Sequence, residues 1–193
     1  VNQSYLVIDN IIAAAQKTDA DAIHPGYGFL SENADFARAC EAAGIVFIGP
    51  TVEAIHLMGS KRLSKIAMLE AKVPCIPGYE GAAQDDDTLI REAARIGYPL
   101  MIKASAGGGG RGMRLVHEAS ELTTQIRTAR SEAQNAFGSG ELILERAVIK
   151  PRHVEIQVFG DQHGNIVYLG ERDCSVQRRH QKVVEEAPCP VMT

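Results

Sequence analysis

The sequence predicts a mixed fold, with a parallel α/β layer in its first 50 residues and an α+β unit after it. Near the N-terminus, short apolar runs flank a helical pattern in strand, helix, strand order with short joins. Two prolines and a glycine then interrupt the segment Val73–Gly78, where we expect a domain boundary. Beyond it, two apolar runs flank a row of glycines, which is the pattern of a β-hairpin.

The first elements follow from apolar spacing and from residues that cap helices. Asn2 or Ser4 is expected to cap the first helix, and Ser31 to cap the second. Gly44 lies where a helix C-terminal cap is expected. The expected elements are helices over 6–15, 31–43 and 61–71, with short strands at 20–24 and 45–48.

The second unit is predicted in the same way. Asp85–Asp87 place acidic side chains at the start of a helix that Gly97 ends, and Ser120 is expected to cap a longer helix. The expected elements are helices over 85–96 and 120–133, strands at 100–105, 112–116, 141–146, 152–159 and 165–170, and a turn at 161–164.

Composition excludes several classes of protein. The 193 residues are 45% hydrophobic and 23% charged, with a net charge of −4, which is typical of a globular protein and argues against a general nucleic-acid binder. No apolar run has the length of a membrane span. Four cysteines without a C-x-x-C pair predict a reducing compartment and neither a disulfide framework nor a Cys/His metal site: Cys40, Cys75, Cys174 and Cys189.

The glycine row Gly107–Gly112 has the G-x-G-x-x-G spacing, but an extended run follows it instead of a helix. This context favours a hairpin flap over nucleotide phosphates, because backbone N–H groups approach an anion closely where no Cβ intervenes. A flexible surface turn is the alternative. Lys103, in the apolar strand before the glycines, either pairs with a phosphate or faces solvent.

Two further segments carry polar side chains in a pattern. Residues 152–159 alternate strictly, so that His153, Glu155 and Gln157 share one face, which either is hydrated or lines a ligand site. Residues 171–182 hold four cationic side chains, a histidine and two glutamines. That run is either a solvated surface or a site for a polyanion or a bicarbonate-sized ligand. Taken alone, the residues predict an ATP-phosphate site and a second anion site without naming a reaction.

Four motifs in order resemble the biotin carboxylase component of biotin-dependent carboxylases: His24–Asn33, Ile102–Met113, Pro151–Val158 and Glu171–Pro188. The resemblance covers essentially the whole chain and implies the ATP-grasp fold. It implies the end of a Rossmann-like N-terminal domain at 1–50, a linker with a helix at 51–78, a lid domain at 79–147 and the start of the central sheet domain at 148–193. The implied reaction uses MgATP and bicarbonate to carboxylate the ureido nitrogen of biotin through carboxyphosphate.

The resemblance also implies roles for the matching residues. Lys182, at a bicarbonate site, and His180, near the phosphates, are the implied catalytic residues, and Tyr27 and Gly28 lie where biotin approaches. Arg146 stands where relatives often have lysine, a change that preserves backbone contacts to adenine and puts a side-chain role in question. The implied nucleotide-binding residues are Lys61, Lys103, Gly109, Gly110, Glu145, Arg146, Ala147, Val148, His153 and Gln177.

The implied partners are a biotin carboxyl carrier domain and a carboxyltransferase, in a homo-oligomer located in the bacterial cytoplasm or the mitochondrial matrix. Both ends of the sequence read as cut ends. The resemblance implies that the Mg²⁺ ligands lie beyond residue 193, so the isolated chain is expected not to turn over. The alternatives are another ATP-grasp ligase, similar to carbamoyl-phosphate synthetase or a purine-pathway carboxylase, and a non-catalytic nucleotide-binding module.

Overall fold

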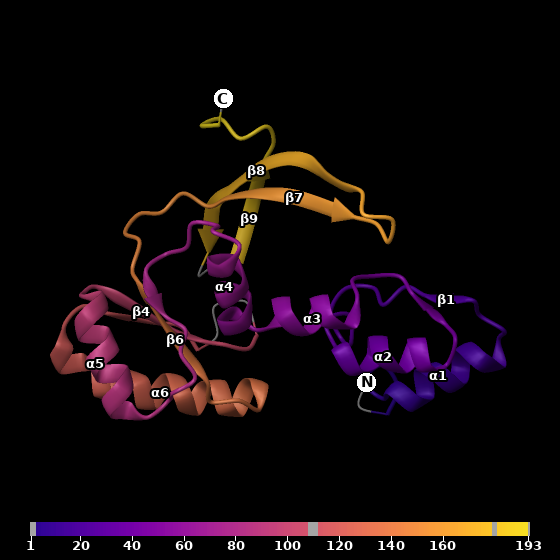
Figure 1. Ribbon diagram of the computed structural model, residues 1–193, viewed down its shortest axis with the longest axis horizontal. Coiled ribbons are helices and arrows are strands. Elements are labelled where there is room, and N and C mark those ends of the chain that lie inside the picture. The colour runs from indigo at the N-terminus through magenta and orange to yellow at the C-terminus, as the bar shows by residue number, and fades with distance from the viewer. Residues whose placement is uncertain (1–2, 108–111, 179–180, 193) are drawn as a thin grey trace. The chain divides into compact units, whose positions relative to one another are not determined.

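The computed structural model in Figure 1 describes residues 3–107, 112–178 and 181–192. The chain divides into two compact units, Val1–Cys75 and Ile76–Thr193. The first unit has one sheet and the second has two, so each unit is described by itself. Among the described residues, no helix has the length and apolar character needed to cross a bilayer.

The first unit contains the expected parallel layer. Strands β1 (Ala22–Ile23) and β2 (Val46–Phe47) pair in parallel, and helices α1 (Ile8–Lys17) and α2 (Ala34–Ala42) pack with them. The ring of Phe36 meets that of Phe47 edge to face, with centroids 5.8 Å apart. The strand, helix, strand prediction is confirmed because these apolar positions lie on facing sides of the helix and the sheet.

Both predicted N-terminal caps of this unit are wrong. Helix α2 is capped by Asn33, whose Oδ1 accepts a hydrogen bond from the Phe36 N–H at 2.8 Å, so Ser31 lies outside the helix. Asparagine caps as well as serine does, and its extended backbone here places Oδ1 over the first turn. Helix α1 begins after Val7 with no side-chain cap, while the Ser4 carbonyl accepts from Val7 N–H in a preceding turn.

Two consecutive helices follow, and only the second was predicted. Helix α3 (Val52–Gly59) is capped by Thr51, and helix α4 (Lys61–Glu70) is capped by Ser60, whose Oγ accepts from the Leu63 N–H at 3.2 Å. The predicted helix over 61–71 is confirmed. Helix α3 escaped prediction because it is only 8 residues long and its last residue is a glycine, which disfavours helix.

The second unit contains a four-stranded antiparallel sheet in the order β3-β6-β4-β5, covered by helices α5 and α6 (Figure 1). Leu100, Ile102 and Leu144 are fully buried between sheet and helices. The predicted hairpin is confirmed, since β4 and β5 pair antiparallel across the glycine row. The bounds are β3 Gly78–Tyr79, α5 Asp86–Ile96, β4 Leu100–Ala104, β5 Arg114–Val116, α6 Ala119–Phe137 and β6 Leu142–Arg146.

The predicted ends of α5 are confirmed, and the predicted cap of α6 is wrong. Asp85 Oδ1 accepts from the Thr88 N–H at 2.8 Å, and Gly97 ends α5 with φ 84°. Helix α6 begins at Ala119 with no side-chain cap, so that Ser120 already lies inside it. The Ser120 hydroxyl donates instead to the Glu118 carboxylate at 2.7 Å, which removes it from any capping role.

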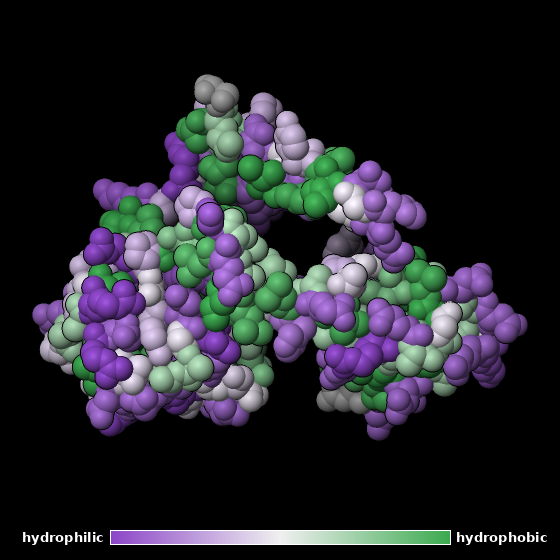
Figure 2. All heavy atoms as spheres, in the orientation of Figure 1, coloured by the Kyte–Doolittle hydropathy of each residue, from purple (hydrophilic) through white to green (hydrophobic). Residues whose placement is uncertain are grey.

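A three-stranded antiparallel sheet completes the second unit: β7 (Val154–Gly160), β8 (Ile166–Arg178) and β9 (Gln181–Glu186), in that order. Strand β8 is longer than predicted because it continues through the charged run. The pairing of β7 with β8 and that of β8 with β9 both contain shifts in register. Figure 2 shows hydrophobic side chains along this sheet, in green at the top of the view. The exposed ones are Ile156, Val158, Phe159, Ile166, Val167, Tyr168, Leu169, Val176, Val183 and Val184.

Candidate functional site

The predicted nucleotide residues Lys103 and Glu145 form an ion pair on the four-stranded sheet. Neighbours of Lys103 on β4 point into the core, since Ile102 and Ala104 are buried, so its own side chain lies on the opposite face. Its Nζ donates to Glu145 Oε2 at 2.6 Å, and the two side chains are 23% and 11% exposed. An ammonium has three donors, so Lys103 is positioned by the carboxylate and still has hydrogen-bonding capacity for a phosphate.

The two described residues of the glycine row, Gly107 after β4 and Gly112 before β5, both have left-handed backbone. Gly107 has φ 79°, and a Cβ added there would lie 2.1 Å from the Phe137 ring. Gly112 has φ 67°, and its carbonyl accepts from Ala104 N–H at 3.1 Å, which closes the hairpin. The two predicted phosphate contacts, Gly109 and Gly110, lie outside the described residues.

The segment 145–148, predicted to contact adenine, is held by backbone hydrogen bonds to the residues just before β3 and β4. Arg146 N–H donates to the Pro77 carbonyl at 2.9 Å, and Ala147 N–H donates to the Pro99 carbonyl at 3.0 Å. The Arg146 guanidinium donates to the Ile96 carbonyl at 2.9 Å. It thus binds the last residue of α5, where a positive charge is favourable. Val148, the next predicted contact, is exposed.

Charged side chains converge on Glu155 in the three-stranded sheet. Arg172, its register partner on β8, donates Nε to Glu155 Oε1 at 2.9 Å, and Lys182 on β9 donates to Oε2. His153 Nε2 lies 3.6 Å from Oε2. The hydrogen bond from Lys182, followed by that from Arg172, lowers the pKa of Glu155 to about 2, so it is ionised at neutral pH. The same bonds raise the pKa of Lys182 and of Arg172.

The predicted residues His153 and Gln177 lie together at the start of this sheet. Gln177 Nε2 lies 3.2 Å from His153 Nδ1 and also donates to the Cys174 carbonyl at 2.9 Å. His153 N–H donates to Ser175 Oγ at 2.9 Å. Both residues are therefore held against β8, which lies between β7, with Glu155, and β9, with Lys182.

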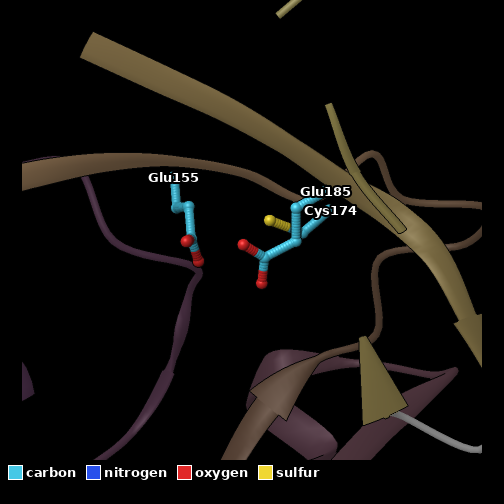
Figure 3. Close-up of side chains that lie close together, drawn as sticks. All are labelled: Glu155, Cys174 and Glu185. Carbon is cyan, nitrogen blue, oxygen red and sulfur yellow. The ribbon is translucent and has the colours of Figure 1, made fainter. Parts of the chain in front are cut away.

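Glu155, Cys174 and Glu185 bring one ligand atom each within 4.8 Å of one another (Figure 3). This group does not fit a metal ion well. Both oxygens of Glu155 already bind cations, and burial followed by the charge of Glu155 raises the pKa of the Cys174 thiol. A thiol held neutral is a poor metal ligand. The contacts favour a charge-balanced cluster in which the cationic partners are protein side chains.

The remaining predicted residues lie in the first unit. Tyr27 is 94% exposed, with its ring centroid 6.4 Å from that of His24, and it lines a hollow of about 720 Å³. Gly28 has φ 78°, and its carbonyl accepts from Ser31 N–H. Lys61 is the first residue of α4. His180 lies outside the described residues.

Sequence reasoning placed Glu155 on a polar face but did not assign it a role, and it missed Arg172 as its partner. The available signal was the pairing of two alternating strands that carry opposite charges. Glu155 and Gln157 both accept from Arg172, the latter at 3.0 Å. A similar pair, Arg152 with Asp173 at 3.1 Å, closes the end of the same two strands. Register, which decides both pairs, is not readable from one strand.

Comparisons with known proteins cover both units. Residues 60–193 match the family described as carbamoyl-phosphate synthase L chain, ATP binding domain, and residues 1–55 match the family described as biotin carboxylase, N-terminal domain. The biotin carboxylase of Haemophilus influenzae is 58% identical over 192 residues, which cover 99% of this chain and 43% of that protein. The mitochondrial methylcrotonoyl-CoA carboxylase subunit alpha of Dictyostelium discoideum is 56% identical over 188 residues, which cover 97% of this chain and 27% of that subunit.

A solved structure is similar in fold to this chain. The biotin carboxylase domain dimer of the Hydrogenobacter thermophilus 2-oxoglutarate carboxylase, solved with MgADP, ADP and bicarbonate, superposes with a TM-score of 0.95 at 51% identity. The match covers 98% of this chain and 42% of that one. The chain thus spans less than half the length of the relatives it matches.

Proposed function

The chain belongs to the biotin carboxylase family and has its ATP-grasp fold, and from this we propose that it supplies part of the site that carboxylates biotin. In the proposed reaction, a bicarbonate oxygen attacks the γ-phosphorus of ATP, and ADP leaves. The resulting carboxyphosphate transfers its carboxyl group to the ureido nitrogen of biotin, which loses a proton, and releases phosphate. The observation that carries the proposal is the presence of both family domains in one continuous chain.

The proposed roles follow from the contacts of each group. Lys103, half-buried and oriented by Glu145, is suited to bind nucleotide phosphate, because a partly buried charge acts more strongly than one in water. Lys182, with an ammonium that stays charged beside Glu155, is suited to bind bicarbonate. His153 and Gln177 present polar atoms next to it for the nucleotide. The proposed nucleotide-binding residues also include Lys61, the glycines at 109 and 110, and the segment 145–148, and His180 is proposed to act near the phosphates.

The residues fit a nucleotide better than they fit its metal. Glu145 and Glu155, the carboxylates of the two ion-paired groups, already bind lysine and arginine side chains, so no Mg²⁺ ligand is assigned to them. When bound, Mg²⁺ would neutralise charge on the phosphates. Within this chain, the corresponding contribution comes from Lys103 and from the backbone N–H groups at the glycine row.

Related proteins are subunits or domains of biotin-dependent carboxylases, and a related domain forms a dimer. A biotin carboxyl carrier domain is accordingly the proposed donor of biotin, and a carboxyltransferase the proposed consumer of carboxybiotin, with the chain acting in a homo-oligomer. Relatives include both mitochondrial and bacterial proteins. The bacterial cytoplasm or the mitochondrial matrix is the proposed location. The exposed Tyr27 with Gly28 is the proposed surface that biotin approaches.

The test is ADP release by the protein expressed from its full reading frame, with MgATP and bicarbonate, in the presence and absence of free biotin. Turnover that needs bicarbonate and is stimulated by biotin is the expected result. Turnover indifferent to biotin would assign the protein to another kind of ATP-grasp ligase. Nucleotide binding without turnover in any combination would favour a non-catalytic module.

A further inference from the structure

The cluster around Glu155 contains two carboxylates and two cations whose formal charges cancel. Glu155 lies between Arg172 and Lys182, and Glu185 approaches Arg172 at 3.8 Å. The proposed function uses one of these four groups, Lys182, as the ligand for an anion. The other three have to be arranged so that an anion can approach, because two carboxylates beside a single ammonium would repel it.

Arg172 and Lys182 each bind a different oxygen of the Glu155 carboxylate. The guanidinium binds Oε1 through both Nε and Nη2, and the ammonium binds Oε2. Arg172 is itself held in place, since its Nη2 also donates to Gln157 Oε1 at 3.0 Å and its backbone is paired with that of Glu155. A planar, two-pronged donor of this kind fixes the carboxylate more firmly than an ammonium can.

We propose that Arg172 is a positioning residue for the bicarbonate-binding ammonium of Lys182. By binding Oε1 it orients Glu155 so that Oε2 alone meets Lys182, and it supplies the positive charge that balances Glu185. The ammonium then keeps donors for an incoming anion, at a site with no net negative charge. The inference rests on the proposed function, because it takes bicarbonate as the anion that Lys182 binds.

Removal of Arg172 changes two properties at once. The Glu155 carboxylate, no longer held by the guanidinium, interacts with Lys182 through both oxygens. The local charge also becomes negative, which opposes entry of bicarbonate. Both effects act on the anion and leave the Lys103–Glu145 pair on the other sheet unchanged, so a defect specific to bicarbonate is expected.

The experiment measures steady-state ADP release by the protein expressed from its full reading frame, with bicarbonate and ATP varied separately. Arg172→Gln is expected to raise the KM for bicarbonate about tenfold while the KM for ATP stays within about twofold. Arg172→Lys retains the charge and loses the two-pronged bond, so it is expected to raise the KM for bicarbonate about threefold, which is less than the rise expected for Arg172→Gln. Arg127→Gln is the matched control, because it removes the same charge from an exposed position on α6.

The outcomes separate this inference from the proposal on which it rests. Equal rises in both KM values for Arg172→Gln, or no rise in either, would overturn the positioning role. If Arg172→Gln does not fold, Arg172→Lys still decides, since a KM for bicarbonate unchanged from the unmodified protein contradicts any need for the two-pronged bond. Lys182→Gln tests the premise separately: an unchanged KM for bicarbonate in that variant would remove Lys182 from the bicarbonate site itself.

Discussion

Glu155 shows how one side chain can be fixed by groups from two other strands of its sheet. It lies on β7, and it accepts hydrogen bonds from Arg172 on β8 and Lys182 on β9. Neither partner is recognisable from local spacing. The alternation of residues 152–159 correctly predicted that Glu155 and Gln157 share a face, but the partners depend on register, which is set by the whole sheet.

The pH dependence of stability follows from the same residue. The pKa of Glu155 is about 2 in the folded protein against an ordinary 4.5, so its ionised form stabilises the fold above about pH 4.5, and this contribution is lost as pH falls from 4.5 toward 2. Glu155→Gln is therefore expected to lower the free energy of unfolding at pH 7 and to lower it less at pH 3. Urea unfolding at both pH values, followed by amide signals of β7–β9, measures the difference.

Glu186→Gln, an exposed carboxylate on the same sheet, is the control for that measurement. A destabilisation by Glu155→Gln that is the same at both pH values would contradict the assigned ionisation.

Gly107 is fixed by two separate constraints. It has φ 79°, and a Cβ there would meet the Phe137 ring at 2.1 Å. Gly107→Ala is expected to lower the free energy of unfolding by about 3 kcal/mol, since an overpacking cost adds to backbone strain. Gly138 also has a positive φ, 72°, but has no atom within 4 Å of an added Cβ. Gly138→Ala is expected to cost only about 1 kcal/mol. Equal costs in thermal unfolding would refute the clash.

At the scale of elements, long segments with regular spacing were predictable and their ends were not. Helices α4, α5 and α6 and the β4–β5 hairpin lie where apolar periodicity placed them. Helix α3 was missed because it is short. Caps failed where several candidates lie within a few residues, as at Ser31 and Asn33. A cap is chosen by backbone geometry, and several serines or asparagines satisfy the sequence preference equally.

The corrected cap of α2 gives a direct test. Asn33→Ala removes an acceptor for the Phe36 N–H and is expected to lower the free energy of unfolding of the first unit by about 1 kcal/mol. Ser31→Ala lies outside the helix and is expected to change it by less than about 0.5 kcal/mol. Denaturant unfolding of both variants compares them directly. A larger loss of unfolding free energy for Ser31→Ala than for Asn33→Ala would contradict the assignment of Asn33 as the cap of α2.

At the scale of the whole molecule, the resemblance predicted family and fold across the chain, while its site residues fall in both compact units. Tyr27, Gly28 and Lys61 belong to the first unit, and Lys103, Glu145 and Lys182 to the second. Side-chain pairs within a unit, such as Glu155 with Arg172, follow from the register of the paired strands.

The division into units predicts where a protease will cut first. Residues 71–77 include no helix or strand, and Lys72 is exposed with φ 59°. Limited trypsin digestion is expected to cleave after Lys72 and to release two compact fragments, identifiable by mass spectrometry. Lys72→Gln is expected to slow this cleavage while leaving other sites unaffected. Initial cleavage within α6, whose arginines lie in a continuous helix, would contradict the division.

The exposed apolar strands of the β7–β9 sheet have a practical consequence for handling the protein. Two edge strands and a row of valine, isoleucine and aromatic side chains favour association between copies, and mutual charge repulsion opposes it. That repulsion vanishes near the isoelectric point of 5.9. Precipitation is therefore expected to be fastest in mildly acidic buffers, and purification is best carried out well above that pH.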